Sequence, residues 1–515
     1  MASRTTGIRA PNAIETGCQG FAPGRVPEPC TLVIFGASGD LTRRELMPAL
    51  YQLFSIGLLP DPFAVIGFAR RPWTDDAFRG EMYAAVAARG NQESDGWAAF
   101  SRHLFYVRGD FDEPESDAYR QLRERILKPG AFPMPGNVLF HLATPPEHYP
   151  TIVAGLKSAA LAETGSGWRR IVIEKPFGTD RESACALHGQ LLQAFREEQI
   201  YRIDHFLGKE TVQNMLVFRF ANPSFEPIWN RNYIDNVQIS VAEDIGIEGR
   251  AAFYESTGVM RDMVQNHLLQ LLCMVAMEPP VRFDARSLRN ETVEVLRAIR
   301  PLDPASDAVR GQYGSGTVRG AAVPGYRMEK GVSPSSNMAT FAALRVRIDN
   351  WRWAGVPFYL KTGKRLPRKL AEVVIEFKPT PHLMFPLDQD RPRQRDTLTF
   401  RLQPEEGIIQ RFVAKQPGPE ICMQPVKMTL LYADAFGIEK PPSAYEWLLL
   451  DAMRGEQTLF ARGDWVEAAW SIVDPLIRYW QTHPATDFPN YPAGTEGPAA
   501  AARLLAGDGR EWIKT

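Results

Sequence analysis

The chain has 515 residues, of which 44% are hydrophobic and 10% aromatic, so it has enough apolar material for two or three domains. Its 59 lysines and arginines nearly balance its 60 aspartates and glutamates, and the net charge of -1 excludes a general attraction to nucleic acid or anionic membranes. The 5 cysteines include no C-x-x-C pair, which argues against a disulfide framework or a zinc site and favours reduced thiols in the cytoplasm.

Residues 1–27 form the first segment, and we expect them to be a flexible N-terminal extension. They contain glycine, proline, alanine and arginine, but they have no apolar stretch of the kind that a signal peptide requires. Their three arginines leave an organelle-targeting role as the alternative. The most apolar runs farther along, such as Leu268–Ala276, are much shorter than the roughly 18 residues that suggest a membrane span. We therefore expect a cytoplasmic protein with no membrane partner.

Short β-rich runs alternate with helical stretches in residues 28–205. The runs read TLVIF, FAVIGFA, LFYVRGD, NVLFHLA, RRIVIEK and IYRID. This alternation is typical of βαβ units around a parallel sheet. We therefore predict an N-terminal α/β domain with a Rossmann-like parallel sheet.

A glycine-containing turn follows the first run, which ends at Phe35. The turn is Gly36-Ala37-Ser38-Gly39-Asp40-Leu41, and a helical stretch then begins with Thr42-Arg43. Glycines between a strand and a helix let backbone N–H groups approach a phosphate. A tight turn that needs glycine only for its backbone shape is the alternative. The place of the turn, after the first strand of a βαβ series, favours a dinucleotide site.

The second run ends in Arg70-Arg71, where an NAD enzyme usually places an acidic residue for the ribose 2′-hydroxyl. Two cations at this position suit a 2′-phosphate and therefore favour NADP. A solvated strand edge is the other explanation of the pair.

Two further runs end in charged residues. Lys175, in the sequence EKPFG, stands at the carboxyl end of a parallel strand, where open α/β sheets bind their ligands. RIDHFLGKE follows the last run, and its His205 and Lys209 are suited to holding a sugar phosphate. A surface lysine at a turn and ion pairs at a helix start are the structural alternatives.

Residues 206–515 show a different pattern, with longer alternating strands and fewer helices between them. We expect helices at Gly258–Met277 and Tyr445–Thr482 and a long loop at Pro301–Pro334. This pattern predicts an α+β domain with an antiparallel sheet. The expected strands are Asn236–Glu243, Phe341–Asp349, Glu372–Lys378, Thr397–Gln403 and Gly407–Ala414.

The segment GVMRDMVQNHLLQ combines an apolar stripe with polar residues. Met260, Val264 and Leu268 recur at helical spacing and predict a core helix, with His267 beside the stripe. A packed structural histidine is the alternative to a catalytic one. Asp262 and His267 are about 140° apart on a regular α-helix, so helical geometry alone does not bring them to one face.

Together, GASGDL, EKPFG, RIDHFLGKE, RDMVQNHLLQ and NWRWAGVPFYLKTGKRLP resemble the glucose-6-phosphate dehydrogenase family, in family order. The resemblance implies an NADP-binding Rossmann-like domain at residues 28–205. It also implies an α+β domain at 206–515, whose large, mostly antiparallel sheet forms the interface of a homodimer or homotetramer. The implied reaction is NADP-dependent oxidation of D-glucose 6-phosphate at C1 to 6-phospho-D-glucono-1,5-lactone, without a metal.

The resemblance further implies roles for single residues. His267 matches the proton acceptor of the family, and Asp204 matches the carboxylate that orients it. The expected substrate contacts are Lys175, His205, Lys209, Glu243, Asp262, Lys364 and Lys369. The expected cofactor contacts are Gly36, Ala37, Ser38, Gly39, Asp40, Leu41, Thr42, Arg43, Arg70, Tyr149 and Lys175.

The chain departs from the family pattern at three places. Phe206 replaces the tyrosine that is common after RIDH, and Asn337-Met338 replaces a more frequent threonine-glutamate pair. Thr42-Arg43-Arg44 departs from the usual alanine-lysine pattern but retains positive charge.

Two alternative functions belong to other classes. One is a sugar oxidoreductase of the glucose/inositol dehydrogenase type, which shares an EKP turn but lacks RIDH-x-LGKE. The other is a non-catalytic NADP-sensing protein on the same scaffold. The presence of His267, Asp204, Lys175 and Lys209 argues against it, because a decayed site need not keep all four.

Overall fold

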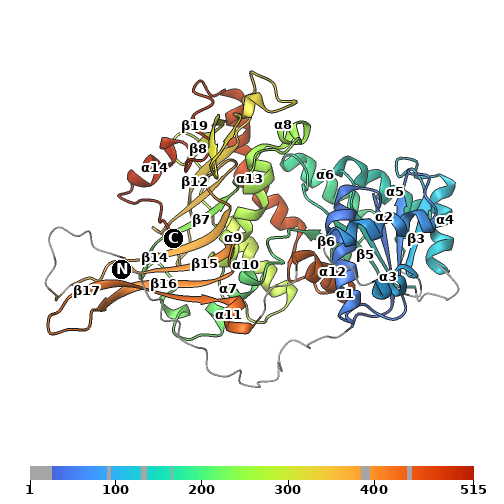
Figure 1. Ribbon diagram of the computed structural model, residues 1–515, viewed down its shortest axis with the longest axis horizontal. Coiled ribbons are helices and arrows are strands. Elements are labelled where there is room, and N and C mark those ends of the chain that lie inside the picture. The colour runs from blue at the N-terminus through green and yellow to red at the C-terminus, as the bar shows by residue number, and fades with distance from the viewer. Residues whose placement is uncertain are drawn as a thin grey trace.

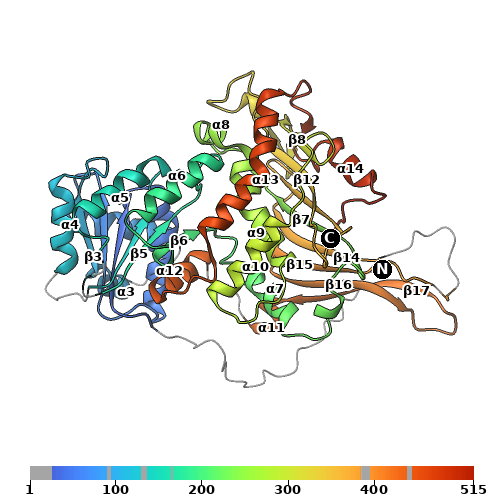
Figure 2. The same cartoon turned by 180° about the vertical axis from the view of Figure 1, so that it is seen from behind.

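A computed structural model describes residues 26–89, 94–128, 136–163, 165, 167–382, 384–385, 395–437 and 443–515. Residues 1–25 of the expected extension lie outside these ranges. Two sheets dominate the fold, one early and one late in the chain, and helices lie between them (Figure 1). Figure 2 shows α9, α10 and α13 in this middle layer from the opposite side.

The first sheet has seven strands in the order β18-β6-β5-β4-β1-β2-β3. Its first six strands in sequence pair in parallel. All six residues of β1 are buried, as expected for a parallel strand that is covered on both faces. The order reverses between β1 and β4, and ligands of such sheets bind outside the carboxyl ends of the strands near this switch point. The strands are β1 (Cys30–Phe35), β2 (Phe63–Ala69), β3 (Leu104–Arg108), β4 (Val138–Leu142), β5 (Arg169–Ile173), β6 (Ile200–Ile203) and β18 (Phe460–Ala461).

Helices connect the parallel strands. The α-helices are α1 (Met47–Ser55), α2 (Asp75–Ala87), α3 (Ser94–Ser101), α4 (Asp117–Leu127), α5 (Tyr149–Ser158) and α6 (Arg181–Leu192). Short helices of other types are η1 (Thr42–Leu46), η2 (Pro146–His148) and η3 (Glu197–Gln199). Because α1 directly follows the π-helical η1, the glycine turn after β1 enters a helix, as the sequence predicts.

The second sheet has eight strands in the order β17-β16-β15-β14-β7-β13-β12-β8. All its pairs are antiparallel except β7 with β13. Its strands are β7 (Ile234–Ala242), β8 (Ala308–Gly311), β12 (Phe341–Arg347), β13 (Pro357–Gly363), β14 (Leu370–Phe377), β15 (Thr397–Gln403), β16 (Gly407–Lys415) and β17 (Met423–Leu431).

Two shorter pairs, β10 with β11 and β19 with β9, lie beside the large sheet. These strands are β9 (Tyr313–Gly314), β10 (Gly316–Val318), β11 (Ala321–Val323) and β19 (Tyr491–Pro492). The helices of this half are α7 (Glu210–Phe220), η4 (Glu226–Ile228), α8 (Ala251–Val259), η5 (Met260–Leu268), α9 (Leu269–Ala276), α10 (Ala285–Arg297), η6 (Tyr326–Met328), α11 (Tyr432–Phe436), α12 (Ala444–Arg454), α13 (Gly463–Thr482) and α14 (Ala499–Ala506).

A late segment of the chain returns to the first sheet. β18 pairs antiparallel with β6, Phe460 lying opposite Ile203. Arg170 of β5 donates to the carbonyls of Ala452 and Met453 at the end of α12, at 3.0 and 2.6 Å. The two halves are therefore linked by packing as well as by the chain, and the division into 28–205 and 206–515 stays a prediction.

The predicted α/β plus α+β architecture is confirmed, but several details were wrong. The expected loop at Pro301–Pro334 contains β8 to β11, whose two to four residues are too short to show a periodicity. The central strand β13 was missed because all its residues are buried and no polar alternation marks it. Gly455, with φ 84°, ends α12 and divides the helix expected at Tyr445–Thr482. Among the described residues, no helix is long and apolar enough to cross a membrane.

Candidate active site

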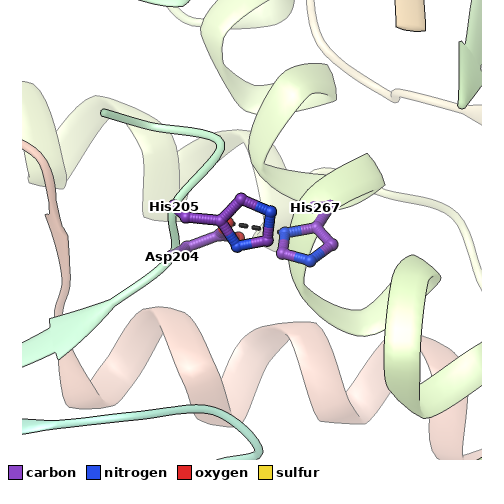
Figure 3. Close-up of side chains that lie close together, drawn as sticks. All are labelled: Asp204, His205 and His267. Carbon is purple, nitrogen blue, oxygen red and sulfur yellow. Dashed lines mark hydrogen bonds and ion pairs between the residues drawn. The ribbon is translucent and has the colours of Figure 1, made fainter. Parts of the chain in front are cut away.

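The candidate site lies where the two halves meet. Asp204 comes directly after β6, and Lys175 comes two residues after the end of β5. Both are therefore at the carboxyl edge of the parallel sheet. η5 brings His267 from the other half and packs against β7 and β13. Figure 3 shows Asp204 and His205, from the loop after β6, facing His267.

Asp204 and His267 form a buried pair. Nδ1 of His267 lies 2.6 Å from Oδ1 of Asp204, and each side chain is 1% exposed. The backbone N–H of Phe206 donates to the same carboxylate oxygen at 2.9 Å. Because a carboxylate only accepts hydrogen bonds, Nδ1 carries the proton and Nε2 of a neutral ring is left as the acceptor. The lysine ammonium of Lys175 occupies this acceptor at 2.9 Å.

Lys175 also joins His267 to Asp262. Its Nζ donates to Oδ1 of Asp262 at 3.1 Å and to the carbonyl of the same residue at 2.9 Å. A regular α-helix would put Asp262 and His267 about 140° apart, but η5 is a π-helix. A π-helix bonds residue i to residue i+5 and so turns less per residue than an α-helix. Residues five apart therefore come to the same side.

Burial and nearby charges set the protonation states of these groups. Burial lowers the pKa of His267, although the charge of Asp204 opposes this shift. For Asp204, burial alone would raise the pKa, but the interactions with His267 outweigh it and lower the pKa to about 2. Burial likewise opposes the ionisation of Asp262, yet Lys175 and Lys364 lower its pKa to about 2. At neutral pH the site therefore holds an uncharged imidazole between ionised carboxylates.

His205 and Phe206 surround the dyad with rings. The His205 ring lies 4.6 Å from that of His267, and the Phe206 ring stacks on His267 at 4.3 Å. Burial lowers the pKa of His205 well below its usual value. Phe206, the departure from the family pattern, thus supplies an apolar face to the dyad where a tyrosine would bring a hydroxyl.

The three ligand atoms that Asp204, His205 and His267 offer all lie within 4.8 Å of one another, a spacing that would also suit a metal. The ammonium of Lys175, at 2.9 Å from Nε2 of His267, opposes the binding of a cation there.

Lys209 lies beyond Phe206, with Nζ 5.4 Å from the centre of the Phe206 ring. Burial lowers the pKa of Lys209, Glu406 opposes that shift, and the positive charge of Lys369 adds to it. Lys369 is exposed. Lys209 is therefore within electrostatic reach of a second ammonium, an arrangement that favours an anion between them.

Lys364 and Glu243 meet because of strand register. β13 and β7 are parallel, with Gly363 opposite Ala242, so the next residue of each strand lies at the same end. Nζ of Lys364 is 2.6 Å from Oε2 of Glu243, and the Lys364 side chain is 2% exposed. The structure thus brings both predicted substrate contacts into one ion pair.

The glycine turn after β1 packs tightly against the neighbouring strand. Gly36 has φ +81°, and a Cβ added there would lie 2.5 Å from the carbonyl oxygen of Ala143. Thr42 Oγ1 donates to the carbonyl of Gly36 at 3.3 Å, which ties the helix start to the turn. Only glycine fits at position 36. Of the other predicted residues here, Ala37 is buried, Ser38, Gly39 and Leu41 are half-buried, and Asp40 is exposed and paired with Arg44.

Arginines and aromatic rings gather at the end of β2. The guanidinium of Arg70 lies 5.3 Å from the centre of the Phe111 ring. Those of Arg43 and Arg71 lie 5.7 and 5.2 Å from the centre of the Trp73 ring. Arg43 also pairs with Glu81 at 2.5 Å. Trp73 was not predicted as a site residue, although it follows the Arg70-Arg71 pair by only two residues.

The side chain of Tyr149 is fully buried. Its hydroxyl donates to the carbonyl of Glu174 at 3.0 Å. The Glu174 carboxylate lies between His141 at 3.1 Å and the Tyr445 hydroxyl at 3.2 Å. Sequence reasoning missed these three residues, and Tyr445 gave no signal because it comes from a distant helix. Through its hydrogen bond to the Glu174 carbonyl, Tyr149 holds the turn that carries Lys175.

Two family models match adjoining parts of the chain. The model described as "Glucose-6-phosphate dehydrogenase, NAD binding domain" matches residues 33–214. The model described as "Glucose-6-phosphate dehydrogenase, C-terminal domain" matches residues 216–513.

Individual proteins are similar over nearly the whole chain. The glucose-6-phosphate 1-dehydrogenase of Aggregatibacter actinomycetemcomitans is 48% identical, over 94% of this chain and 97% of its own. That of Chlamydia pneumoniae is 44% identical, over 97% and 99%. A solved structure of a glucose-6-phosphate dehydrogenase in complex with its substrate glucose-6-phosphate has a TM-score of 0.85 at 34% identity, covering 95% of this chain and 99% of the other.

Proposed function

The chain belongs to the glucose-6-phosphate dehydrogenase family, and on that premise we propose that it oxidises D-glucose 6-phosphate at C1 to 6-phospho-D-glucono-1,5-lactone with NADP. This reaction is the first step of the oxidative pentose phosphate pathway. The observation that carries the proposal is the buried dyad, in which His267 is held by Asp204 at 2.6 Å and presents Nε2 at 2.9 Å from Lys175.

The dyad suits the removal of a proton from the C1 hydroxyl. Bound NADP supplies the acceptor for the hydride that leaves C1. His267 is uncharged at neutral pH, and its Nε2 is the free acceptor once the substrate hydroxyl takes the place of Lys175. Asp204 keeps the proton on Nδ1 and stabilises the imidazolium that forms, because the carboxylate stays ionised.

The cofactor would lie along the carboxyl edge of the first sheet. Gly36 keeps the turn after β1 tight, since a Cβ there would clash with the carbonyl of Ala143, and a turn of this kind before a helix start suits a pyrophosphate. We assign the pyrophosphate to Gly36 through Arg43, and the 2′-phosphate to Arg70. Lys175, after the end of β5, would face the reacting carbon, and Tyr149 would hold the turn that carries Lys175 through its hydrogen bond to the Glu174 carbonyl.

The substrate would lie between the two halves. The phosphate is assigned to His205 and Lys209, with Lys369 as a second cation. Lys209 lies beside the Phe206 ring and within electrostatic reach of Lys369. His205 directly precedes Phe206 in sequence and contacts the His267 ring. The sugar hydroxyls are assigned to Asp262, Glu243 and Lys364, whose charged groups pair with lysines or carboxylates of the same site. When the sugar binds, its hydroxyls would replace the contacts between lysines and carboxylates in these ion pairs.

We further propose a homodimer or homotetramer in the cytoplasm, formed through the large sheet. Its edge strand β17 has solvent-exposed apolar side chains, among them Met428 at 50% and Leu430 at 46% exposure. An exposed edge with apolar residues is a candidate surface for a second copy. Sedimentation of the full chain tests this, and a monomer at micromolar concentration would contradict it.

The decisive experiment measures NADPH absorbance with the purified chain. We expect turnover with glucose 6-phosphate and NADP, and much lower kcat/KM with free glucose or with NAD. His267→Asn serves as the matched negative control. Turnover with free glucose as fast as with the phosphate would favour a general sugar oxidoreductase, and NADP binding without turnover would favour a sensing protein.

A further inference from the structure

A hollow lies behind the catalytic helix, outside the site described above. It has a volume of about 280 Å³ and lies between the start of η5, the end of α13, and the segment before β12. Neither Lys175, Asp262 nor His267 lines it. Its size is at the lower end of the ~300 to 1,000 Å³ that small-molecule sites occupy.

The walls of the hollow combine apolar and cationic groups. Val259, Met260, Met338 and Ile477 supply apolar surface, and Trp480 supplies an indole. Met338 belongs to the pair that departs from the family pattern, where a glutamate is more frequent. Here, a thioether stands in place of a negative charge.

Two guanidinium groups also line the hollow. Arg261 donates Nε to the carbonyl of Thr179 at 2.6 Å, and Arg310 donates to the carbonyls of Trp480, at 3.0 Å, and His483. Within the described residues, neither arginine forms an ion pair with a carboxylate. Asp180 and Asp474 act on Arg261, and Asp487 acts on Arg310, only from beyond ion-pair distance. Each guanidinium therefore lacks a direct carboxylate partner and can bind an anion.

Glu255 is the carboxylate among the lining residues, and its charge is already engaged. Oε1 of Glu255 accepts hydrogen bonds from the Tyr326 hydroxyl at 2.5 Å and from Ser336 at 2.7 Å. An anionic group would avoid this side of the hollow. The favourable orientation therefore places it toward the arginines.

We propose that the hollow binds a small monocarboxylate with a flat apolar body, its carboxylate on the arginines and its body against Trp480 and Met338. Aromatic and thioether side chains pack well on a flat ring. Two positive charges without a paired carboxylate favour an anion over a neutral molecule of the same shape.

The position of the hollow couples it to the catalytic helix. Gly258 turns the chain into η5 with φ +61°, and a Cβ there would lie 2.3 Å from the sulfur of Met338. Val259 donates its backbone N–H to Ala339 at 3.2 Å. Arg261 reaches the loop that follows Lys175 and Pro176. A ligand that moves Met338 or Arg261 would thus shift the start of the helix that carries Asp262 and His267, and would lower turnover without occupying the substrate site.

Binding is tested with 2-naphthoate and its neutral analogue 2-naphthamide, by calorimetry on the full chain. We expect 2-naphthoate to bind at least tenfold more tightly than the amide, since one charge-assisted hydrogen bond accounts for that factor. Saturating NADP and glucose 6-phosphate should leave the affinity unchanged. Equal affinity for the two probes, or competition with NADP or glucose 6-phosphate, would overturn the proposal.

A charge variant on α13 locates the bound anion. Gln481 lines the hollow and is exposed, so Gln481→Glu adds a carboxylate with little risk to folding. We expect at least tenfold weaker binding of 2-naphthoate. Thr482→Glu adds the same charge one residue later, outside the lining, and should bind normally. Equal weakening in both variants would show a general charge effect and would contradict the site.

The coupling is tested by turnover, and only this arm rests on the proposed function. Saturating 2-naphthoate should lower kcat severalfold and leave both KM values nearly unchanged, and Gln481→Glu should need a correspondingly higher probe concentration. Binding with unchanged kcat would refute the coupling but not the site. A chain that binds the probe yet never oxidises glucose 6-phosphate would refute the proposed function instead.

Discussion

The dyad and the arginines at the end of β2 are both charged regions, but they are built in opposite ways. Asp204 and His267 are each 1% exposed and joined at 2.6 Å. Arg70 and Arg71 are exposed, and their guanidinium groups lie over aromatic rings at 5.3 and 5.2 Å. Buried charges are screened little by salt and water, whereas exposed charges are screened strongly. We therefore expect the loss of activity on substitution to be largest at the most buried of these charged residues and smallest at the most exposed.

His267→Asn should have the largest effect. We expect kcat to fall by about 10² to 10⁴-fold, the usual contribution of a general base, while the affinity for glucose 6-phosphate changes little. The measurement is kcat from NADPH absorbance, together with substrate affinity by calorimetry. His188→Asn is the matched control, because His188 also pairs with a carboxylate, Glu467 at 3.1 Å, but lies on α6 outside the site.

The outcome that would contradict a catalytic role is specific. If His267→Asn lost affinity and melting temperature while kcat per folded molecule stayed normal, the histidine would be a packed residue of η5. A normal His188→Asn enzyme would then exclude a general sensitivity to histidine loss.

Asp204→Asn should have the next largest effect, a loss in kcat of roughly 10 to 10³-fold, because an amide cannot stabilise the imidazolium. The pH profile gives a second test. The dyad acts when His267 is neutral, so kcat/KM falls as pH drops through its lowered pKa. The Asp204 charge raises that pKa relative to burial alone, so the acid limb of the variant should move to lower pH. An acid limb that stays in place would show that another group titrates.

Much of the first half of the fold was predictable from the sequence. Its parallel strands are buried on both faces and read as continuous apolar runs, such as the CTLVIF of β1. The edge and short strands of the second half lack this signal, and β18 joins the first sheet from about 260 residues away in sequence. Contacts over such a separation depend on tertiary packing, which no local pattern reports.

The candidate site shows the same division. Asp204, Lys175 and Gly36 were found because strand ends mark them in the sequence. The proximity of Asp262 and His267 was not, because nothing in GVMRDMVQNHLLQ distinguishes a π-helix from an α-helix. The family resemblance supplied His267 as a candidate, and the helix type explains how it reaches Lys175.

Lys209→Ala should have an intermediate effect, because Lys209 is only half-buried. Losing a charge-assisted hydrogen bond to phosphate costs about 1.5 to 3 kcal/mol, or roughly 10 to 100-fold in kcat/KM. The loss should appear with glucose 6-phosphate and not with free glucose. Lys157→Ala, on the exposed face of α5, is the control. An unchanged preference for the phosphorylated sugar would show that Lys209 does not bind the phosphate.

Arg70→Ala should have the smallest effect and separates the cofactors. Arg70 is exposed, so water screens its charge and the loss should be about 1 kcal/mol, roughly fivefold in kcat/KM with NADP. NAD lacks the 2′-phosphate, so kcat/KM with NAD should not change. Arg71→Ala is the matched comparison at the same strand end, since its guanidinium faces Trp73 and not Phe111. An equal fall in kcat/KM with NADP and with NAD would show that Arg70 does not bind the 2′-phosphate. A loss as large as that of His267→Asn would show that exposure does not rank the effects of substitutions in these two regions.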